Sequence, residues 1–236
     1  MKYVILGGVA AGTKAAAKLK RCDRKAEVKV FTKGEDISYA GCGLPYYIGG
    51  DIPAKEGLIV NTPKKYAGLT GAAVYTGCEA VGVSPEKKEV TFTKASGETF
   101  TESYDKLIIS TGAVPFVPPV EGTGLSGVFC LRTPKDAVNI RAYIEEKKCR
   151  KAVVCGAGFI GLEAAENLMA QGLEVTVIDA MPQIMPNAFD PEMADFAKRQ
   201  LKKAGMRILT ATSLTGIRVT DHIEEVLTDN GNLEAD

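Results

Sequence analysis

One cysteine in this sequence stands where a thiol could do chemistry. Cys42 lies between two glycines in the run SYAGCGLPYY, residues 38–47. Glycine lets the backbone approach a ligand closely and leaves a neighbouring sulfur unshielded. A helix that begins here would favour the thiolate, the nucleophilic form of the side chain. Cysteine is also a common small core residue, so the local sequence leaves two interpretations open: a reactive thiol and a buried packing residue.

Other reactive side chains are scarce. His222 is the only histidine, which argues against a histidine-based triad and excludes a multi-histidine metal site. The six cysteines include no C-x-x-C pair and no zinc spacing. We expect His222 to lie in an exposed turn, and Cys130 and Cys155 to be packing residues. Any chemistry must therefore come from a cofactor, a thiol or a carboxylate.

A complete dinucleotide-binding pattern lies in the second half of the chain. Gly156, Gly158 and Gly161 have the G-x-G-x-x-G spacing, and Asp179 follows eighteen residues after the last glycine, at the end of a predicted strand. In such a motif the acid accepts hydrogen bonds from a ribose 2′-hydroxyl and repels a 2′-phosphate. No arginine follows Asp179, so the pattern favours NADH over NADPH. A purely structural glycine turn is the alternative interpretation.

A related pattern at the N-terminus departs from this motif at two positions. Gly7 and Gly12 occupy the first and third glycine positions, but Val9 replaces the middle glycine and Thr32 replaces the acid. Taken alone, this copy leaves nucleotide binding and a structural turn equally open. Its similarity to the second copy favours a nucleotide, with the Thr32 hydroxyl or a backbone group making the ribose contact.

The elements around these motifs predict the fold class. Each motif reads as a buried strand, a tight turn, an alanine-rich helix and a second strand, which is typical of a parallel sheet covered on both faces. A hairpin is expected at residues 88–101 and another at 227–236. We therefore predict an α/β fold with two Rossmann-like dinucleotide-binding domains, parallel sheets and a small antiparallel β-meander. The domains would be 1–116 for FAD and 117–236 for NAD(H), divided in a stretch rich in proline and glycine. Helical spacing covers 133–148 and 191–204.

Composition excludes several classes of protein. The 236 residues are 45% apolar and 25% charged, with 29 basic and 29 acidic side chains. A net charge of zero argues against a general nucleic-acid binder, and no apolar run is long enough to span a bilayer. The apolar stretch at the N-terminus is too short for a signal peptide. We expect a cytoplasmic protein without nucleic-acid, membrane or metal partners.

The whole chain resembles the pyridine nucleotide-disulfide oxidoreductases, flavoproteins in which an NAD(P)H domain interrupts an FAD domain. The likeness rests on the two β-α-β units, SYAGCGLPYY, DKLIISTGAVP at 105–115 and GVFCLRTPKDA at 127–137. It is most similar to the branch of coenzyme A-disulfide reductases, NADH oxidases and NADH-dependent persulfide reductases. Most disulfide reductases carry a C-x-x-x-x-C pair, but Tyr47 stands at the second position here. The resemblance implies that Cys42 is the single catalytic redox centre.

The resemblance also implies the cofactor-binding residues. Phe159 would cover the flavin face that nicotinamide must reach, and Glu163 would lie near the nicotinamide. The FAD contacts would be Gly7, Gly8, Val9, Ala10, Ala11, Gly12, Phe31, Thr32, Lys33, Ala80, Ser110, Thr111, Gly112 and Arg132. The NADH contacts would be Gly156, Gly158, Phe159, Ile160, Gly161, Glu163 and Asp179.

A cationic stripe on the first helix indicates a substrate. Lys14, Lys18 and Arg21 fall at i, i+4 and i+7, on one helix face. Such a stripe is most often a solvated surface. In the coenzyme A-disulfide reductases, however, this helix lines the coenzyme A channel, and the resemblance adds Ser38 and Gly41 as substrate contacts. Gly41 replaces the asparagine of those enzymes.

We therefore expect an FAD-dependent NADH:disulfide oxidoreductase that reduces a small disulfide or persulfide of the coenzyme A type. One rival is an NADH oxidase or peroxidase in which Cys42 cycles through sulfenic acid. Another is a non-catalytic dinucleotide-binding, redox-sensing module. By resemblance, a third flavin motif and a homodimer interface would lie beyond Asp236, and FAD affinity would be lowered without them.

Overall fold

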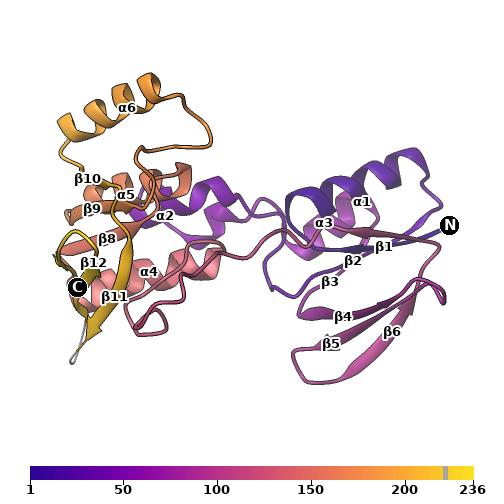
Figure 1. The fold of residues 1–236 in the computed structure, drawn as a ribbon. Coiled ribbons are helices and arrows are strands. Elements are labelled where there is room, and N and C mark those ends of the chain that lie inside the picture. The colour runs from indigo at the N-terminus through magenta and orange to yellow at the C-terminus, as the bar shows by residue number, and fades with distance from the viewer. Residues whose placement is uncertain (220–222) are drawn as a thin grey trace. The chain divides into compact units, whose positions relative to one another are not determined.

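The computed structural model describes residues 1–219 and 223–236, and His222 lies outside this range. The chain divides into two units (Figure 1). Unit 1 comprises Met1–Ala40 and Glu56–Val114, and unit 2 comprises Gly41–Lys55 and Pro115–Asp236. The segment that carries Cys42 therefore belongs to unit 2, although the residues on either side of it belong to unit 1. The domain limits 1–116 and 117–236 stay a prediction.

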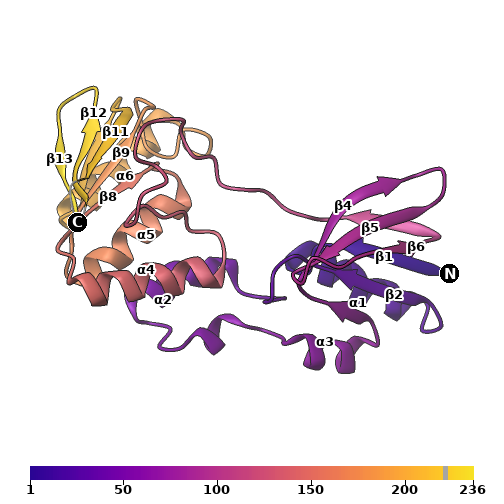
Figure 2. The same ribbon diagram turned by 90° about the horizontal axis from the view of Figure 1, so that it is seen from below.

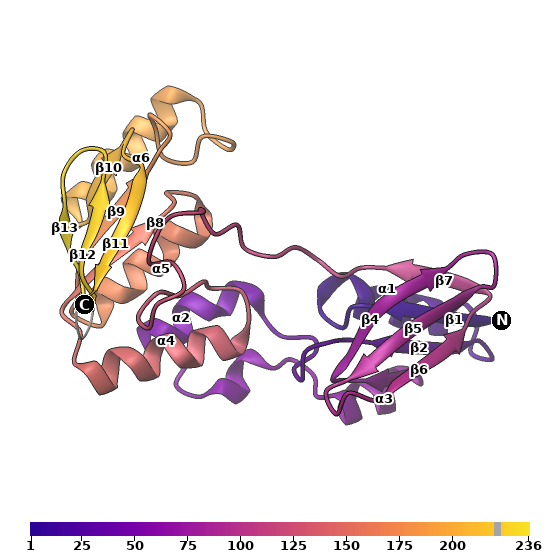
Figure 3. The same ribbon diagram turned by 60° about the horizontal axis from the view of Figure 1, so that its bottom comes forward.

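Unit 1 is built on a parallel sheet with the strand order β3-β2-β1-β7. Val4, Ile5 and Leu6 are all buried because layers cover both faces of this sheet. The helices α1 and α3 pack on one face, and an antiparallel meander of β4, β5 and β6 covers the other (Figure 3). The strands are β1 (Lys2–Leu6), β2 (Glu27–Phe31), β3 (Ala73–Tyr75), β4 (Cys78–Ser84), β5 (Glu89–Lys94), β6 (Thr99–Ser103) and β7 (Lys106–Ile109); the helices are α1 (Ala10–Cys22) and α3 (Pro63–Thr70).

Unit 2 repeats this plan around the parallel sheet β10-β9-β8. Its meander, β11-β12-β13, packs on one sheet face through a cluster that includes Val226 and Ile178, and α5 packs against β8 and β9. The short helix α2 lies against α4 and α5 (Figure 2). The strands are β8 (Lys151–Cys155), β9 (Glu174–Asp179), β10 (Arg207–Thr210), β11 (Leu214–Val219), β12 (Ile223–Thr228) and β13 (Leu233–Glu234); the helices are α2 (Leu44–Gly49), α4 (Pro134–Lys147), α5 (Phe159–Ala170) and α6 (Pro191–Lys203), and two 3-10 turns, η1 (Gly41–Gly43) and η2 (Lys55–Leu58), flank α2.

The same pair of backbone and side-chain hydrogen bonds occurs within each unit, and no sequence pattern predicted it. In unit 1 the Asp105 amide donates to the carbonyl of Lys2 (2.9 Å), and the Lys2 amide donates to the Asp105 carboxylate (2.6 Å). In unit 2 Asp236 and Lys151 exchange the same two bonds, at 3.1 and 2.8 Å. In both units the aspartate follows the meander and is held at the first residue of the strand that precedes the glycine loop, β1 in unit 1 and β8 in unit 2.

The predicted fold class is confirmed, with one addition. The chain forms two α/β units with parallel sheets, and each carries its own antiparallel meander, whereas the sequence predicted one. The expected hairpins correspond to β5–β6 and β12–β13. Among the described residues, no helix is long and apolar enough to cross a membrane.

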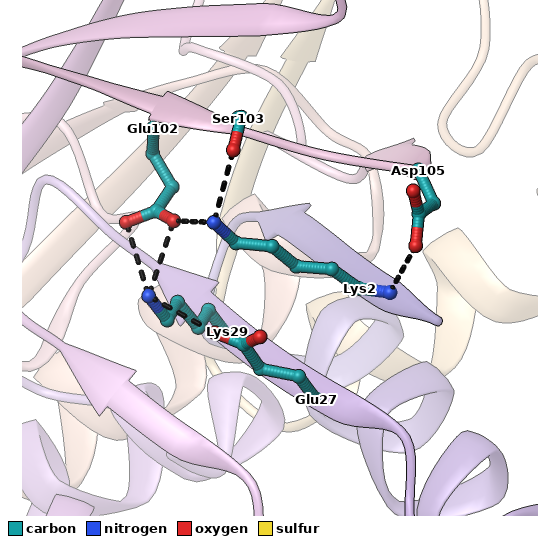
Figure 4. A network of polar contacts seen from close by, with 6 residues as sticks. All are labelled: Lys2, Glu27, Lys29, Glu102, Ser103 and Asp105. Atoms are coloured by element: carbon teal, nitrogen blue, oxygen red, sulfur yellow. Dashed lines mark hydrogen bonds and ion pairs between the residues drawn. The ribbon is translucent and has the colours of Figure 1, made fainter.

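A network of ion pairs joins the meander of unit 1 to its parallel sheet (Figure 4). The Glu102 carboxylate on β6 is 15% exposed and accepts hydrogen bonds from the ammonium groups of Lys2 on β1 and Lys29 on β2. Lys29 Nζ lies 3.1 and 3.2 Å from the two Glu102 oxygens and 3.2 Å from a Glu27 oxygen. One carboxylate therefore holds two cations from neighbouring strands.

The ion pairs of this network shift the pKa values of Glu102 and Lys29. Burial opposes ionisation of Glu102, but the hydrogen bonds from Lys2 and Lys29 outweigh it and set the pKa of this carboxyl below its ordinary value. Burial also opposes protonation of Lys29, but hydrogen bonds to Glu102 and Glu27 outweigh it and raise the pKa of Lys29. Both shifts stabilise the charged network at neutral pH.

Replacing Glu102 tests this network. Glu102→Gln removes the negative charge that Lys2 and Lys29 share and leaves Lys29 with Glu27 alone. We expect it to lower the free energy of unfolding at pH 7 by about 1–2 kcal/mol. Because the folded-state pKa of Glu102 is lowered, its contribution is complete above the unfolded-state pKa and is lost as pH falls through the folded-state value. The difference between wild type and Glu102→Gln, measured by urea unfolding, should therefore shrink below about pH 4.

Glu98→Gln is the matched control. Glu98 pairs with Lys94 at 2.8 Å on the same meander, but its side chain is 60% exposed. An exposed pair of this kind contributes less than about 0.5 kcal/mol. Equal losses of unfolding free energy in Glu102→Gln and Glu98→Gln would contradict this description of the network. So would a difference between wild type and Glu102→Gln that persists in acid.

Candidate functional site

The second glycine loop has the geometry that a dinucleotide requires. Gly156 has a φ of +109°, which a residue with a side chain rarely adopts. An ideal Cβ on Gly161 would lie 1.9 Å from the Gly156 carbonyl oxygen, so α5 is packed directly on the loop. An ideal Cβ on Gly158 would meet nothing within 4 Å. The three glycines thus provide the tight turn, the close helix packing and an open approach to the backbone.

Asp179 lies at the end of β9, against this loop. One carboxylate oxygen accepts the Ala157 N–H at 2.7 Å, and the other accepts the Met181 N–H at 2.8 Å. These bonds fix the carboxylate at the carboxyl edge of the sheet. Each oxygen keeps a second acceptor position, so the group can accept a ribose hydroxyl while its charge repels a phosphate.

The helices that follow the two glycine loops begin without a side-chain cap. α3, α4 and α6 start with Thr62, Thr133 and Asp190, each of which accepts a backbone N–H of the first turn. α1 and α5 start after Val9 and Gly158, with no side-chain cap and no acid in the first turn. Their first N–H groups are therefore available to an anion, and the helix dipole favours a phosphate there.

The first glycine loop is similar but more enclosed. Gly7 has a φ of +107°, and an ideal Cβ on Gly12 would lie 1.8 Å from the Gly7 carbonyl oxygen. Val9 takes the place that Gly158 has in the second loop. Thr32 is buried, and its methyl group would lie 3.1 Å from a Cβ on Gly8. The loop can present backbone N–H groups, but the neutral Thr32 gives it no ribose-binding acid.

Several predicted FAD contacts lie around this loop. Ser110 Oγ donates to the Leu6 carbonyl at 2.8 Å, which places the start of 110–112 beside the end of β1. Lys33 is exposed and pairs with Glu79 at 3.0 Å. Ala80 lies at the register shift of β4. The Phe31 ring stacks on Tyr75 and Phe92 in the core, and the Phe31 carbonyl accepts the Gly7 N–H at 2.8 Å, at the start of the glycine loop.

Cys42 is exposed and lies in η1, two residues before α2. A helix that begins here was only a condition in the sequence analysis, and the structure shows one, α2, that begins at Leu44. All six cysteines are free thiols. The expectation that Cys130 and Cys155 are packing residues is wrong: both are exposed, and Cys155 ends β8, an edge strand of the parallel sheet of unit 2. Cys78 is buried, and burial raises the pKa of its thiol.

The predicted substrate residues of unit 1 lie on α1 and in the loop that follows β2. Lys14, Lys18 and Arg21 are exposed on α1, and no ion pair among the described residues involves them. Ser38 has a left-handed φ of +47°, and its N–H donates to the Gly8 carbonyl at 2.9 Å, beside the first glycine loop. Asn61 donates to the Ser38 hydroxyl at 3.3 Å. Sequence analysis missed Asn61, because no local pattern links residues this far apart.

In unit 2 the first turn of α5 presents apolar side chains. Phe159 is 59% exposed and Ile160 is 62% exposed, directly after the glycine loop. Glu163 follows on the same helix and lines a hollow of about 270 Å³ between α5 and α6. The Arg132 N–H donates to Asp136 at 3.1 Å in front of α4. Exposed apolar side chains beside a glycine turn of this kind are typical of a surface that a ligand covers.

A family model and the sequences of curated proteins were compared with this chain, and both indicate the same family. The family model of the pyridine nucleotide-disulphide oxidoreductases matches residues 1–236. The "NADH oxidase" of Methanocaldococcus jannaschii is 35% identical over 236 residues, which cover 100% of this chain and 53% of that protein. The "NAD(P)H sulfur oxidoreductase (CoA-dependent)" of Pyrococcus abyssi is 37% identical over 233 residues, covering 99% and 51%. The chain thus spans about half the length of these curated relatives.

Solved structures agree. The reduced CoADR-RHD of Bacillus anthracis superimposes with a TM-score of 0.95 and 36% identity, covering 100% of this chain and 42% of that one. The NAD-dependent persulfide reductase of A. fulgidus gives 0.94 and 35%, covering 100% and 44%. An engineered water-forming NADPH oxidase bound to NADPH, a mutant of the NADH oxidase from Lactobacillus brevis, gives 0.90 and 28%, covering 100% and 52%.

Gly158→Ala separates the ligand-binding role of this loop from its structural role. The φ of Gly158 is −84°, which alanine adopts readily, and the new Cβ would meet no protein atom within 4 Å. We expect the melting temperature to stay within about 2 °C of wild type. The Cβ would obstruct the approach of a pyrophosphate, so the Kd for NADH, measured by calorimetry, should rise at least about tenfold.

Gly68→Ala provides the control for that substitution. Gly68 lies in α3 with nothing within 4 Å of its ideal Cβ, in unit 1. This change should leave NADH affinity unaltered and raise stability slightly, because alanine favours a helix. Unchanged NADH binding by Gly158→Ala would remove the loop from the dinucleotide site.

Proposed function

Because the chain belongs to the pyridine nucleotide-disulphide oxidoreductase family, we propose that it provides the FAD- and NADH-binding part of an oxidoreductase that reduces a small disulfide or persulfide. One observation carries this proposal. The exposed Cys42 belongs to the same unit as a complete glycine loop with its acid, Asp179. A thiol and a dinucleotide loop in one unit support transfer of electrons from NADH to a sulfur substrate.

The residues present fit the two cofactors. NADH would be held by the N–H groups at the start of α5 and by the Asp179 carboxylate, with Phe159 and Glu163 near the nicotinamide. FAD would be held by 7–12 and the start of α1, with contacts from Thr32, Lys33, Ala80, 110–112 and Arg132. When bound, the flavin supplies a group that accepts hydride from NADH and passes two electrons to a thiol-disulfide pair.

Cys42 would carry the exchange with substrate. Its thiolate attacks one sulfur of the disulfide, a Cys42–S bond forms, and the second sulfur leaves as a thiolate that takes a proton from water. Return of the mixed disulfide to the free thiol consumes the two electrons of one NADH. Tyr47 occupies the position of a second family cysteine, so the resting enzyme would hold one thiol at this site instead of a pair.

Coenzyme A fits the cationic stripe on α1. Lys14, Lys18 and Arg21 are exposed cations, and cations of this kind suit phosphate groups. Two Pyrococcus relatives are named for coenzyme A-dependent sulfur reduction, and a Staphylococcus haemolyticus relative is named coenzyme A disulfide reductase. We propose that Ser38 and Gly41 also contact this substrate.

A second function is supported by the Methanocaldococcus relative and by the Lactobacillus structure, both named NADH oxidase. In that reaction hydrogen peroxide, formed by reduction of oxygen, would oxidise the Cys42 thiol to sulfenic acid with release of one water. The two electrons of one NADH would then return the sulfenic acid to the thiol with release of a second water. Oxygen consumption in the absence of a disulfide would distinguish it. We also propose a cytoplasmic location, and a homodimer as the state of the full-length enzymes of this family.

Cys42→Ser tests the exchange step. In the chain supplied with FAD and NADH, we expect Cys42→Ser to lower release of coenzyme A from coenzyme A disulfide at least about a hundredfold, because a hydroxyl does not replace a thiolate in disulfide exchange. Released thiol can be measured by chromatography, and NADH affinity should not change. Cys130→Ser, an exposed cysteine in the same unit, should release it as fast as wild type. Full turnover by Cys42→Ser would exclude this mechanism.

Nucleotide preference gives a second test. The engineered NADPH oxidase carries a Gly-to-Ala change, then Asp, Ala and Met replaced by Ala, Arg and Ser at consecutive positions, then Pro replaced by Arg. This chain has the same original residue types at the same spacing: Gly161, Asp179, Ala180, Met181 and Pro186. We infer that Asp179, which no cation follows at position 180 or 181, selects NADH here.

The triple variant Asp179→Ala, Ala180→Arg, Met181→Ser should therefore bind NADPH in preference to NADH. It removes a repulsive carboxylate and adds a guanidinium for the 2′-phosphate, which together shift the ratio of the two Kd values by about 10–100-fold. Titration of each nucleotide by calorimetry measures this ratio. Met181→Ser alone should leave the preference for NADH unchanged, and an unaltered ratio in the triple variant would refute the assignment of Asp179.

A further inference from the structure

The helix that follows Cys42 has only six residues, so its position depends on what it packs against. An isolated helix of this length is not stable in water. Leu44 is 3% exposed and Ile48 is 1% exposed, and α2 packs these side chains within unit 2, where it lies against α4 and α5. Figure 3 shows α2 beside both helices. The location of Cys42 is therefore set by residues far away in the sequence.

The contact with α5 joins the backbone of Gly49 to the side chains of Asn167 and Gln171. An ideal Cβ on Gly49 would lie 2.1 Å from Asn167 Oδ1, so no larger residue fits between the two helices. Asn167 is 5% exposed, and its amide donates to the Glu163 carbonyl at 2.8 Å, which fixes its orientation. Gln171 Nε2 donates to the Gly49 carbonyl at 2.6 Å. A carbonyl at the end of α2 is thus satisfied from α5.

The contact with α4 is made by Arg141. One guanidinium nitrogen donates to the Tyr47 carbonyl at 3.2 Å and to the Pro53 carbonyl at 3.4 Å. The guanidinium carbon lies 5.1 Å from the centroid of the Tyr47 ring. Glu145 binds the same side chain at 3.1 Å. A planar cation that stacks on an aromatic ring and bridges two carbonyls restrains both the end of α2 and the loop after it.

We propose that Arg141 and Gln171 are positioning residues for Cys42. They bind the carbonyls at the end of α2 and hold the helix, and with it the thiol at its start, on α4 and α5. Because α5 begins at the dinucleotide loop, the thiol is held by the same helix that presents N–H groups to the phosphates. The identity of the reaction rests on the proposed function, but the positioning of Cys42 does not.

The test compares Arg141→Ala and Gln171→Ala with Glu145→Gln, which removes a partner of Arg141 and no contact with α2. Hydrogen exchange of the peptide that covers 44–50 reports how firmly α2 is held. The modification rates of Cys42 by coenzyme A disulfide and by iodoacetamide, followed by mass spectrometry of its peptide, report thiol presentation. Arg141→Lys keeps the charge but loses the planar fork.

We expect Arg141→Ala and Gln171→Ala to lower protection of 44–50 about tenfold, with no change in the peptides of β5 and β6. The rate with coenzyme A disulfide should fall about fivefold relative to the rate with iodoacetamide, because the larger reagent needs a defined approach to the sulfur. Arg141→Lys should lower the protection of 44–50 and the ratio of the two rates less than Arg141→Ala does. Glu145→Gln should give wild-type values for both.

Unchanged protection of 44–50 in both alanine variants would overturn the proposal, as would an equal loss in Glu145→Gln. If Cys42 of the wild type reacts with coenzyme A disulfide no faster than Cys130 does, the proposed substrate is wrong. The positioning role is then tested by the hydrogen-exchange protection of α2 alone.

Discussion

At two places in this chain a helix packs so closely on the turn before it that no side chain fits between them. Gly12 lies against the Gly7 carbonyl, and Gly161 lies against the Gly156 carbonyl. Each contact brings the first turn of a helix to the carboxyl end of a parallel strand, β1 or β8. Since neither helix has a side-chain cap, both present unpaired N–H groups where a phosphate can bind. The parallel sheets, the meanders and Asp179 are arranged around these two contacts.

Local patterns in the sequence were sufficient for most of this framework. The glycine spacing, the strand that ends at Asp179 and the β5–β6 hairpin each depend on residues close together in the chain, so periodicity and turn chemistry predict them. The second meander was recognised only through its β12–β13 hairpin. The exposure of Cys155 was mispredicted because a run of apolar strand residues does not reveal which strand lies at the edge of a sheet.

Contacts between distant segments were not predictable from one sequence. Asn61 reaches Ser38, and Arg141 and Gln171 reach the ends of α2, through hydrogen bonds that no local motif requires. The assignment of the Cys42 segment to unit 2 has the same origin, because a six-residue helix goes where its apolar side chains are buried. The sequence identified the thiol, whereas the tertiary structure identified the residues that hold it. The chemistry proposed for Cys42 would therefore depend on side chains that lie outside its own motif.

The proposed function depends on one property, that the chain binds a flavin which NADH reduces. An anaerobic visible spectrum of the protein measures this property when the protein has been incubated with FAD, freed of excess FAD and then given NADH or NADPH in separate samples. We expect a yellow protein that NADH bleaches at lower concentration than NADPH, since Asp179 repels a 2′-phosphate. A protein that retains no flavin, or one that both nucleotides bleach equally, would contradict it.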